Sequence, residues 1–280
     1  MDDLTDQVVA SFAGSADPRF REVMTALVRH LHAFAREVGL TEQEYFAGID
    51  FLTRTGQISG ATRQEFVLLA DVLGLSMLTV GLDDRTPPGA TEPTVFGPFF
   101  VEGSPEVANG DDLANGAPGM PCLVRGTVRE VNGGPVAGAR VEVWQADDEG
   151  FYDVQKDLPE QQNRGHLFTA EDGRFWFWSV RPVAYPIPDD GPVGELLHAA
   201  GRGPMRPAHI HFMVTAPGYQ RLITHVFVAG DEYLGTDAVF GVKPSLIAEF
   251  AEHPPGTAPD GRAIDGPYAT VEYDLVIAPE

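Results

Sequence analysis

The sequence contains a single cysteine, Cys122, among 280 residues. One thiol can form neither a disulfide within the chain nor a cluster of thiolate ligands for a metal ion. We therefore expect a fold that depends on its hydrophobic core, and we expect no zinc site built from cysteines.

Basic residues are also scarce, since 19 Lys and Arg stand against 41 Asp and Glu, which gives a formal net charge of −22. So acidic a surface repels phosphate groups, which argues against nucleic acid and anionic membranes as partners. No apolar run approaches the ~18 residues that a membrane-spanning helix needs. The first residues lack the basic and apolar stretches of a secretory signal, and we expect a cytoplasmic protein.

An apolar stripe indicates helices after residue 18. Its members recur every three or four residues, as on one face of a helix: Phe20, Val23, Met24, Leu27, Leu31, Phe34 and Val38. Thr41 and Glu44 have the spacing of a capping box, which predicts a second helix, and Thr62 and Glu65 repeat it before a third. The first helix either covers the core of its own chain or docks against another subunit, and the pattern favours neither.

The apolar pattern changes to a period of two after a loop that spans about residues 81 to 119. This alternation is typical of β-strands with one buried face. Six segments are predicted to be strands: Cys122–Val131, Ala139–Gln145, Phe175–Val180, His209–Val214, Leu222–Val228 and Val271–Ile277. Short strands with Gly and Pro turns indicate a β-sandwich, so the predicted fold class is mainly β with an α-helical N-terminal part.

His209 and His211 are separated by one residue in a predicted strand, so both imidazoles project from the same face. Two neutral imidazoles side by side make half of a transition-metal site. The alternative is that one histidine lies on the surface and the other is hydrogen-bonded inside the core. The pair by itself does not separate these interpretations.

Two tyrosines upstream, Tyr152 and Tyr185, favour the metal site. With the two histidines they give two nitrogen and two oxygen donors. A phenolate is a hard, anionic and strongly donating ligand that stabilises Fe(III) over Fe(II), whereas zinc sites prefer Cys, His and carboxylate. The donor set therefore predicts ferric iron.

Two other classes of protein stay open at this point. His209 and His211 could belong to a cupin-like Fe(II) or zinc site, but this needs a nearby carboxylate and a third histidine, and His225 alone cannot provide both. The chain could also be a non-catalytic binding module in which the tyrosines are structural. Visible absorption separates the three, because tyrosinate bound to Fe(III) is coloured.

Longer motifs give a family resemblance that covers nearly the whole chain. They are Thr94–Phe99, Gly138–Ala146, Gly150–Asp153, Asp172–Phe175, Arg206–Phe212 and Asp237–Val242. Together they resemble the intradiol ring-cleavage dioxygenases that act on catechol and hydroxyquinol. The resemblance implies a helical dimerisation domain at residues 1–90 and a β-sandwich catalytic domain with the iron site at residues 91–280.

The resemblance also implies roles for particular side chains. Tyr152, Tyr185, His209 and His211 would be the four protein ligands of one non-haem Fe(III) per chain. Tyr185 would leave the metal and take one of the two protons of the substrate. Arg206 would stabilise negative charge on the activated ring, which O2 would then open between its two hydroxylated carbons.

The substrate would lie in a mostly apolar slot beside Arg206, lined by Leu68, Val95, Phe96, Gly97, Pro98, Phe99, Ile187, Pro188 and Val239. Two positions favour hydroxyquinol. His225 stands where the catechol branch usually has glutamine, and we expect it outside the ligand set. Asp71 stands where catechol enzymes have an apolar residue or proline, so it could accept a hydrogen bond from the third hydroxyl, unless it is a solvated helix residue. A catechol or chlorocatechol 1,2-dioxygenase is the alternative.

The expected partners follow from this interpretation. They are a small aromatic diol or triol, O2, and a second copy of the chain bound through the N-terminal helices. The resemblance also implies a lipid, held between the two subunits, as a further partner.

Overall fold

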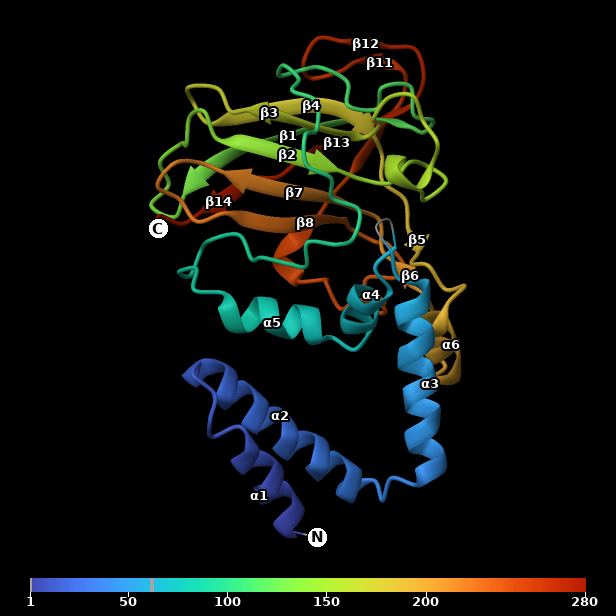
Figure 1. The fold of residues 1–280 in the computed structure, drawn as a ribbon. Coiled ribbons are helices and arrows are strands. Elements are labelled where there is room, and N and C mark those ends of the chain that lie inside the picture. Colours follow the sequence, from blue (N-terminus) through green and yellow to red (C-terminus); the bar gives the residue numbers. More distant parts are fainter. Residues whose placement is uncertain (1, 61–62) are drawn as a thin grey trace. The chain divides into compact units, whose positions relative to one another are not determined.

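The computed structural model describes residues 2–60 and 63–280. The chain forms two compact units, Met1–Gln57 and Ile58–Glu280, which Figure 1 colours along the sequence. The second unit contains all the strands and also helices α4 (Glu65–Val72) and α5 (Leu75–Asp83). The functional division expected at residue 90 stays a prediction.

The first unit is helical. It contains α1 (Asp2–Ser11), α2 (Pro18–Glu37) and nearly all of α3 (Glu42–Ile58). Sequence periodicity did not predict α1, which packs on α2 and places Thr5 Oγ1 2.9 Å from Nδ1 of His32. The apolar stripe of α2 is exposed, with Phe20, Leu31 and Phe34 retaining 50%, 55% and 54% of their accessible surface.

Local sequence explains where two of these helices begin. The Asp17 side chain accepts hydrogen bonds from the backbone N–H groups of Arg19 and Phe20 at the start of α2. At α3 the Glu44 carboxylate accepts from the Thr41 N–H at 2.8 Å, and the Glu44 N–H donates to Thr41 Oγ1 at 3.3 Å, which confirms the predicted capping box. Thr62 of the other predicted capping box lies outside the described residues.

The second unit is a sandwich of two five-stranded sheets. In the first sheet, β1 (Pro121–Glu130) pairs with β4 (Arg174–Val180), β13 (Tyr268–Glu272) and β14 (Leu275–Ile277), and β10 (Ala251–His253) pairs with β13. The second has the order β3 (Arg164–Phe168), β2 (Arg140–Trp144), β7 (His209–Thr215), β8 (Leu222–Val228) and β9 (Ile247–Ala248). Apolar residues of both sheets form one buried core between them. All six predicted strand segments are present.

One predicted strand, 271–277, is divided into β13 and β14, which pair in parallel with successive parts of β1. The break occurs where the carbonyl of Tyr273 approaches Gly126, because a Cβ added at Gly126 would lie 1.9 Å from that oxygen. The Thr127 N–H then donates to Asp274 Oδ1 at 2.8 Å. Only glycine at position 126 admits this interruption.

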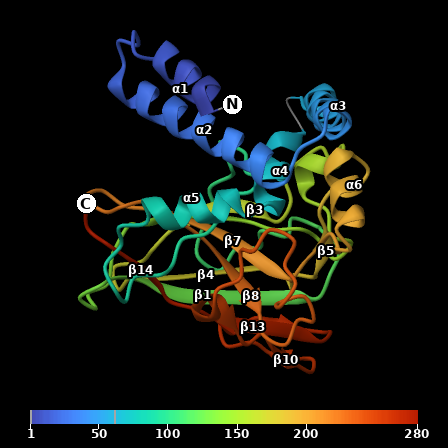
Figure 2. The same ribbon diagram turned by 90° about the horizontal axis from the view of Figure 1, so that it is seen from below.

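Helices and short hairpins cover the ends of the sandwich. Helix α4 contacts α5 and also α6 (Pro192–Ala199), beside which it lies in Figure 2. Two small sheets pair β5 (Tyr185–Pro186) with β6 (Met205–Arg206) and β11 (Gly256–Thr257) with β12 (Ala263–Ile264). Short 3₁₀ turns are η1 (Asp153–Gln155) and η2 (Pro244–Leu246). Among the described residues, no single helix is long and apolar enough to cross a membrane, and only the bent pair α4–α5 meets that test by length and composition.

Candidate metal centre and substrate pocket

The face of the second sheet that points away from the core carries three imidazoles. In β7, Ile210 and Phe212 belong to the sandwich core, so His209 and His211 project from the other face. His225 on β8 is directly opposite His211 in the ladder. One ring nitrogen from each histidine lies within 4.8 Å of the other two, and all three rings are buried.

Two connecting segments bring phenol groups to this face. Tyr152 precedes η1, and Tyr185 lies on β5, where it pairs with Arg206. Tyr152 Oη lies 3.0 Å from Tyr185 Oη and 2.9 Å from His211 Nε2. Tyr185 Oη lies 3.4 Å from His209 Nε2, and the two Nε2 atoms are 3.2 Å apart. The four predicted ligand atoms therefore form a closed ring of short contacts.

This ring has the dimensions that one metal ion requires. Donors held about 2 Å from a common ion lie about 3 Å from their neighbours. The set combines two hard oxygen atoms with two imidazole nitrogens, and the only cysteine, Cys122, is in the sandwich core. The residues therefore fit a non-haem transition-metal site without sulfur ligands.

Burial determines the protonation of these four groups. It raises the pKa of the Tyr152 phenol well above 10.0 and also raises the pKa of Tyr185. It lowers the pKa of both His209 and His211 well below 6.5. The imidazoles are thus neutral and ready to donate a lone pair, and a cation must displace the phenol protons when it binds.

The two histidine rings are held in fixed orientations. His209 Nδ1 donates to the carbonyl of Pro207 at 2.7 Å, which directs Nε2 to the tyrosines. The indole of Trp144 stacks on His211 with ring centroids 4.7 Å apart and planes at 18°. On Gly97, whose φ is 76°, an added Cβ would lie 3.1 Å from Cε1 of His211. The glycine thus lets the backbone of the predicted pocket segment approach the ring closely.

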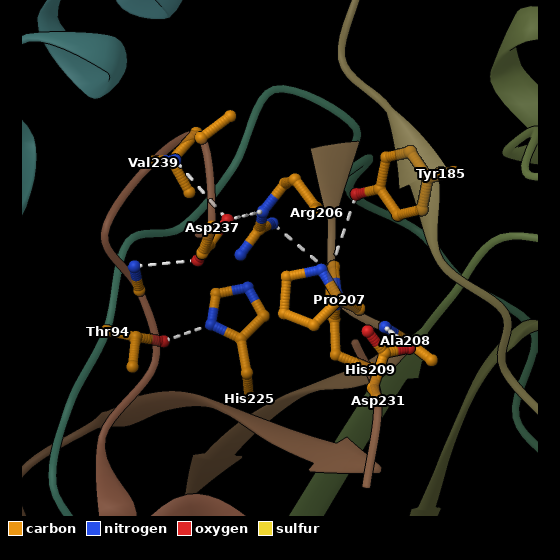
Figure 3. Close-up of polar contacts among 12 residues, drawn as sticks. Thr94, Tyr185, Arg206, Pro207, Ala208, His209, His225, Asp231, Asp237 and Val239 are labelled. Atoms are coloured by element: carbon orange, nitrogen blue, oxygen red, sulfur yellow. Dashed lines mark hydrogen bonds and ion pairs between the residues drawn. The ribbon is translucent and has the colours of Figure 1, made fainter. Parts of the chain in front are cut away.

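Arg206 is buried beside the ligand ring, and Figure 3 shows its side chain next to that of His209. Its Nε donates to Asp237 Oδ1 at 3.2 Å, and its Nη1 lies 3.1 Å from His209 Nε2. Burial is the largest single influence and opposes the charged form, but Asp237, Tyr185 and Tyr152 together outweigh it and raise the pKa of Arg206. A permanent positive charge therefore lies next to the four donor groups.

The residues predicted to form the substrate slot occur in two neighbouring groups. Leu68, Val95, Ile187 and Val239 belong to one buried apolar cluster with α4 and α6. Phe96 and Phe99 pack against Trp144 and the two tyrosines, and the Phe99 ring stacks on Tyr152 with centroids 4.5 Å apart. Pro188 is half-buried and Pro98 is exposed.

Asp71 is a buried residue of α4, with only 4% of its surface exposed. Burial raises the pKa of its carboxyl group, while a hydrogen bond with Ser76 and the charge of Arg206 lower it. A buried carboxyl on the helix that carries Leu68 is unlike a solvated helix residue, which was the other interpretation of this position.

The sequence did not identify the side chains that hold the site in place. Asp237 accepts hydrogen bonds from the N–H groups of Val239 and Gly241 in addition to its pair with Arg206. Arg164 pairs with Asp153 next to Tyr152. One sequence signal was available, namely a charged residue inside a segment that is expected to be buried. Arg164 occurs in a strand, and Asp237 occurs in an apolar motif. Neither pairing could be assigned, because the partners lie 31 and 11 residues apart.

A buried set of two phenols and two imidazoles on a β-sandwich fits a non-haem metal site, and comparisons with known proteins identify the enzyme class. The model of the family "Dioxygenase" matches residues 95–279, and that of "Catechol dioxygenase N terminus" matches residues 17–91. The chain therefore belongs to the intradiol ring-cleaving dioxygenases.

Individual relatives show which members of the family the chain resembles. A hydroxyquinol 1,2-dioxygenase of Nocardioides simplex is 56% identical over 99% of this chain and 95% of its own length. The crystal structure of hydroxyquinol 1,2-dioxygenase from Pseudomonas putida has a TM-score of 0.92 at 49% identity and covers 99% of this chain and 98% of its own. A catechol 1,2-dioxygenase structure from Acinetobacter has a TM-score of 0.88 at 28% identity. The match covers 100% of this chain and 93% of the Acinetobacter chain. The enzyme class and the two-part fold expected from the sequence are thereby confirmed.

Proposed function

We propose that the chain opens the ring of hydroxyquinol, 1,2,4-trihydroxybenzene, between its adjacent hydroxylated carbons with O2, giving a hydroxymuconate or its maleylacetate tautomer. The observation that carries this assignment is the buried carboxyl of Asp71 beside the apolar cluster that contains Leu68 and Val239. A buried acceptor in an apolar slot gives a reason to prefer a third hydroxyl, which catechol lacks. The 56% identity with a hydroxyquinol 1,2-dioxygenase supports the same choice.

Ferric iron is the metal that we propose for the site, held by Tyr152, Tyr185, His209 and His211. Two phenolates give an anionic, hard donor set, which favours Fe(III) over Fe(II), Zn(II) and Cu(II). When bound, the ion would supply a Lewis acid that the two oxygen atoms of the deprotonated diol could chelate and that would draw electron density from the ring. The contacts with Trp144 and Pro207 hold the histidine ligands in position before the metal binds.

The protein must also accept the protons of the diol. Tyr185 has the longer contact of the two tyrosines with its neighbouring histidine, 3.4 Å compared with 2.9 Å for Tyr152. Its buried phenol has a raised pKa, so it retains a proton readily once it is no longer a ligand. We assign to Tyr185 the acceptance of one substrate proton. Arg206 then neutralises part of the negative charge that the substrate has gained.

A direct experiment compares steady-state rates with hydroxyquinol and catechol in iron-loaded protein. Hydroxyquinol should have the larger kcat/KM. A larger value with catechol would reject hydroxyquinol as the preferred substrate but would leave the ring-cleaving activity intact. If neither diol is cleaved, both the substrate assignment and the proposed activity are rejected.

We also propose that the chain is a homodimer. The support is the stripe on α2, where Phe20, Leu31 and Phe34 are each at least half exposed in a single chain. So continuous an apolar surface is rare on monomers and is typical of a contact with a second subunit. An amphipathic lipid between the subunits would cover the part of this surface that the two helices leave open.

A further inference from the structure

Two buried nitrogen atoms next to the ligand ring have no hydrogen-bond partner in the described part of the chain. They are Nη2 of Arg206 and Nε2 of His225, on side chains that are 4% and 0% exposed. Buried polar groups are nearly always paired, because leaving one unpaired costs its full desolvation penalty. Two such groups close together therefore indicate a ligand that contacts both.

The position of the free nitrogen of Arg206 is fixed by the ion pair that its guanidinium group forms with Asp237. Nε donates to Asp237 Oδ1 at 3.2 Å, and this buried ion pair holds the guanidinium group without using His209 Nε2, the proposed metal ligand. Gly241 borders Nη2, and a Cβ added there would lie 3.2 Å from it. Lack of a side chain at position 241 keeps this side of Nη2 open.

The tautomer of His225 follows from its contact with Thr94. Nδ1 of His225 is hydrogen-bonded to Thr94 Oγ1. No other acceptor for the Thr94 hydroxyl is found among residues 2–60 and 63–280, so this hydroxyl donates to Nδ1. In a neutral imidazole with Nδ1 as acceptor, the hydrogen is on Nε2, which is then a donor.

The two free donors face each other. In Figure 3 the Nε2 edge of His225 points to the guanidinium group of Arg206, and the ring of His209 lies beside both. Two N–H donors cannot satisfy one another, and a positive guanidinium group adds a preference for negative charge. The group that satisfies both is an oxygen atom that carries negative charge and at least two lone pairs.

We propose that Arg206 Nη2 and His225 Nε2 form a two-donor site for one anionic oxygen atom of the bound substrate, and that His225 contacts the substrate directly. This rests on the proposed function, in which a vicinal diol loses its protons beside the metal ligands. Arg206 provides charge and one N–H, whereas His225 provides a neutral, directed N–H. Thr94 and Asp237 hold the two donors in position.

A role in packing alone does not account for these features. The His225 ring does fill space against His211 and Phe227, with centroids 4.1 Å and 5.5 Å away. An apolar ring of similar size would fill that space without burying an unpaired N–H. The hydrogen bond between Nδ1 and Thr94 accounts for one ring nitrogen of His225, and Nε2 still requires an acceptor.

Three substitutions separate the donor from the rest of the side chain. His225→Gln places an amide N–H near the position of Nε2. His225→Asn reaches only as far as Nδ1 and can keep the contact with Thr94, while His225→Phe keeps the ring and no donor. Each variant is loaded with iron and titrated with hydroxyquinol without O2, and the dissociation constant is read from the visible spectrum.

We expect His225→Asn and His225→Phe to bind hydroxyquinol roughly 10- to 100-fold more weakly, the effect of one lost hydrogen bond to a charged oxygen. His225→Gln should stay within about fivefold of the parent protein, with iron content and resting spectrum unchanged in all three. Equal affinity of the Asn and Phe variants and the parent would overturn the inference, as would a Gln variant as weak as the Asn variant. Loss of iron from the variants would also overturn it, because His225 would then act on the metal. A parent protein that binds neither hydroxyquinol nor catechol would reject the proposed function itself.

Discussion

Arg164 and Asp153 form an ion pair inside the protein, with Nη2 2.6 Å from Oδ1 and both side chains at most 4% exposed. Asp153 directly follows Tyr152, and Nη2 of the same guanidinium group donates to the carbonyl of Phe99 at 2.8 Å. One arginine therefore connects the backbone next to a predicted metal ligand with the segment that carries the pocket residues Phe96 to Phe99. Phe99 in turn stacks on the Tyr152 ring.

Removing the charge of Arg164 should destabilise the protein strongly. Arg164→Met leaves the Asp153 carboxylate buried without its cationic partner, for which we expect a loss of about 3–5 kcal/mol in the free energy of unfolding. Urea unfolding measures this. Arg174→Met is the control, because its ion pair with Asp172 is exposed and should change stability by less than about 0.5 kcal/mol. Similar losses in both variants would show that burial of the Arg164–Asp153 ion pair does not determine its contribution to the free energy of unfolding.

The iron-loaded protein should be coloured and should contain about one iron per chain. Tyr185→Phe and Tyr152→Phe each remove one phenolate, so the visible charge-transfer band should weaken and shift, while Tyr45→Phe, which changes an exposed ring, should leave it unaltered. Metal analysis and absorption spectra measure both effects. A colourless protein that is fully active with zinc would reject the four-ligand assignment.

Asp71→Ala should reduce kcat/KM for hydroxyquinol selectively. A lost buried hydrogen bond to a charged group costs about 1.5–3 kcal/mol, which is a factor of roughly 10 to 150. Catechol has no third hydroxyl, so its kcat/KM should change little or rise. Steady-state kinetics with both diols measure the difference, and Asp71→Asn tests whether an uncharged acceptor suffices. Equal losses with both substrates would mean that Asp71 acts on folding or on the metal.

Metal-free protein should lose stability in acid because of its three buried histidines. Burial lowers the pKa of His209, His211 and His225 well below the ordinary 6.5, so below about pH 6.5 the unfolded chain binds protons that the folded chain does not. Stability is therefore retained above this pH and falls as the pH decreases, by up to about 1.4 kcal/mol per pH unit for each histidine. Urea unfolding between pH 5 and 8 measures the slope.

The matched variants in this experiment are His225→Gln and His30→Gln. The first removes one of the three buried imidazoles and should reduce the slope, whereas His30 is exposed on α2 and its replacement should not. A slope unchanged in His225→Gln would contradict the prediction. In the proposed site iron binds the neutral imidazoles of His209 and His211, so loading should shift the loss of stability to lower pH.

Charge placed on the exposed face of α2 should separate the subunits. Leu31→Glu buries a carboxylate in the proposed contact, so light scattering should give the mass of one chain, 30.2 kDa, instead of two. Arg29→Glu is the control, because it introduces the same carboxylate, with a larger change in net charge, on an exposed residue of the same helix outside the apolar stripe. A parent protein that is monomeric at micromolar concentration would reject the dimer.

The local sequence determined many of the secondary-structure elements and the choice of candidate ligands. The capping box of Thr41 and Glu44 fixed the start of α3, and alternation fixed strands such as β7, because both depend on residues close together in the chain. Spacing alone placed His209 and His211 on one face of a strand. The identity of the four predicted ligands followed from donor chemistry and from motifs, and the structure brings these donors into contact.

Only the tertiary structure decided how these elements combine. β1 and β2 follow one another in the chain, yet they belong to different sheets. The division of the last predicted strand depends on Tyr273 meeting Gly126 across a distance of 147 residues. Pairs such as Arg206 with Asp237 and His225 with Thr94 are likewise distant in sequence, and burial changes their energetics. A charged or polar residue becomes part of a site only when folding removes water and supplies its partner. The partner is distant in sequence, so a local sequence pattern cannot predict the pairing.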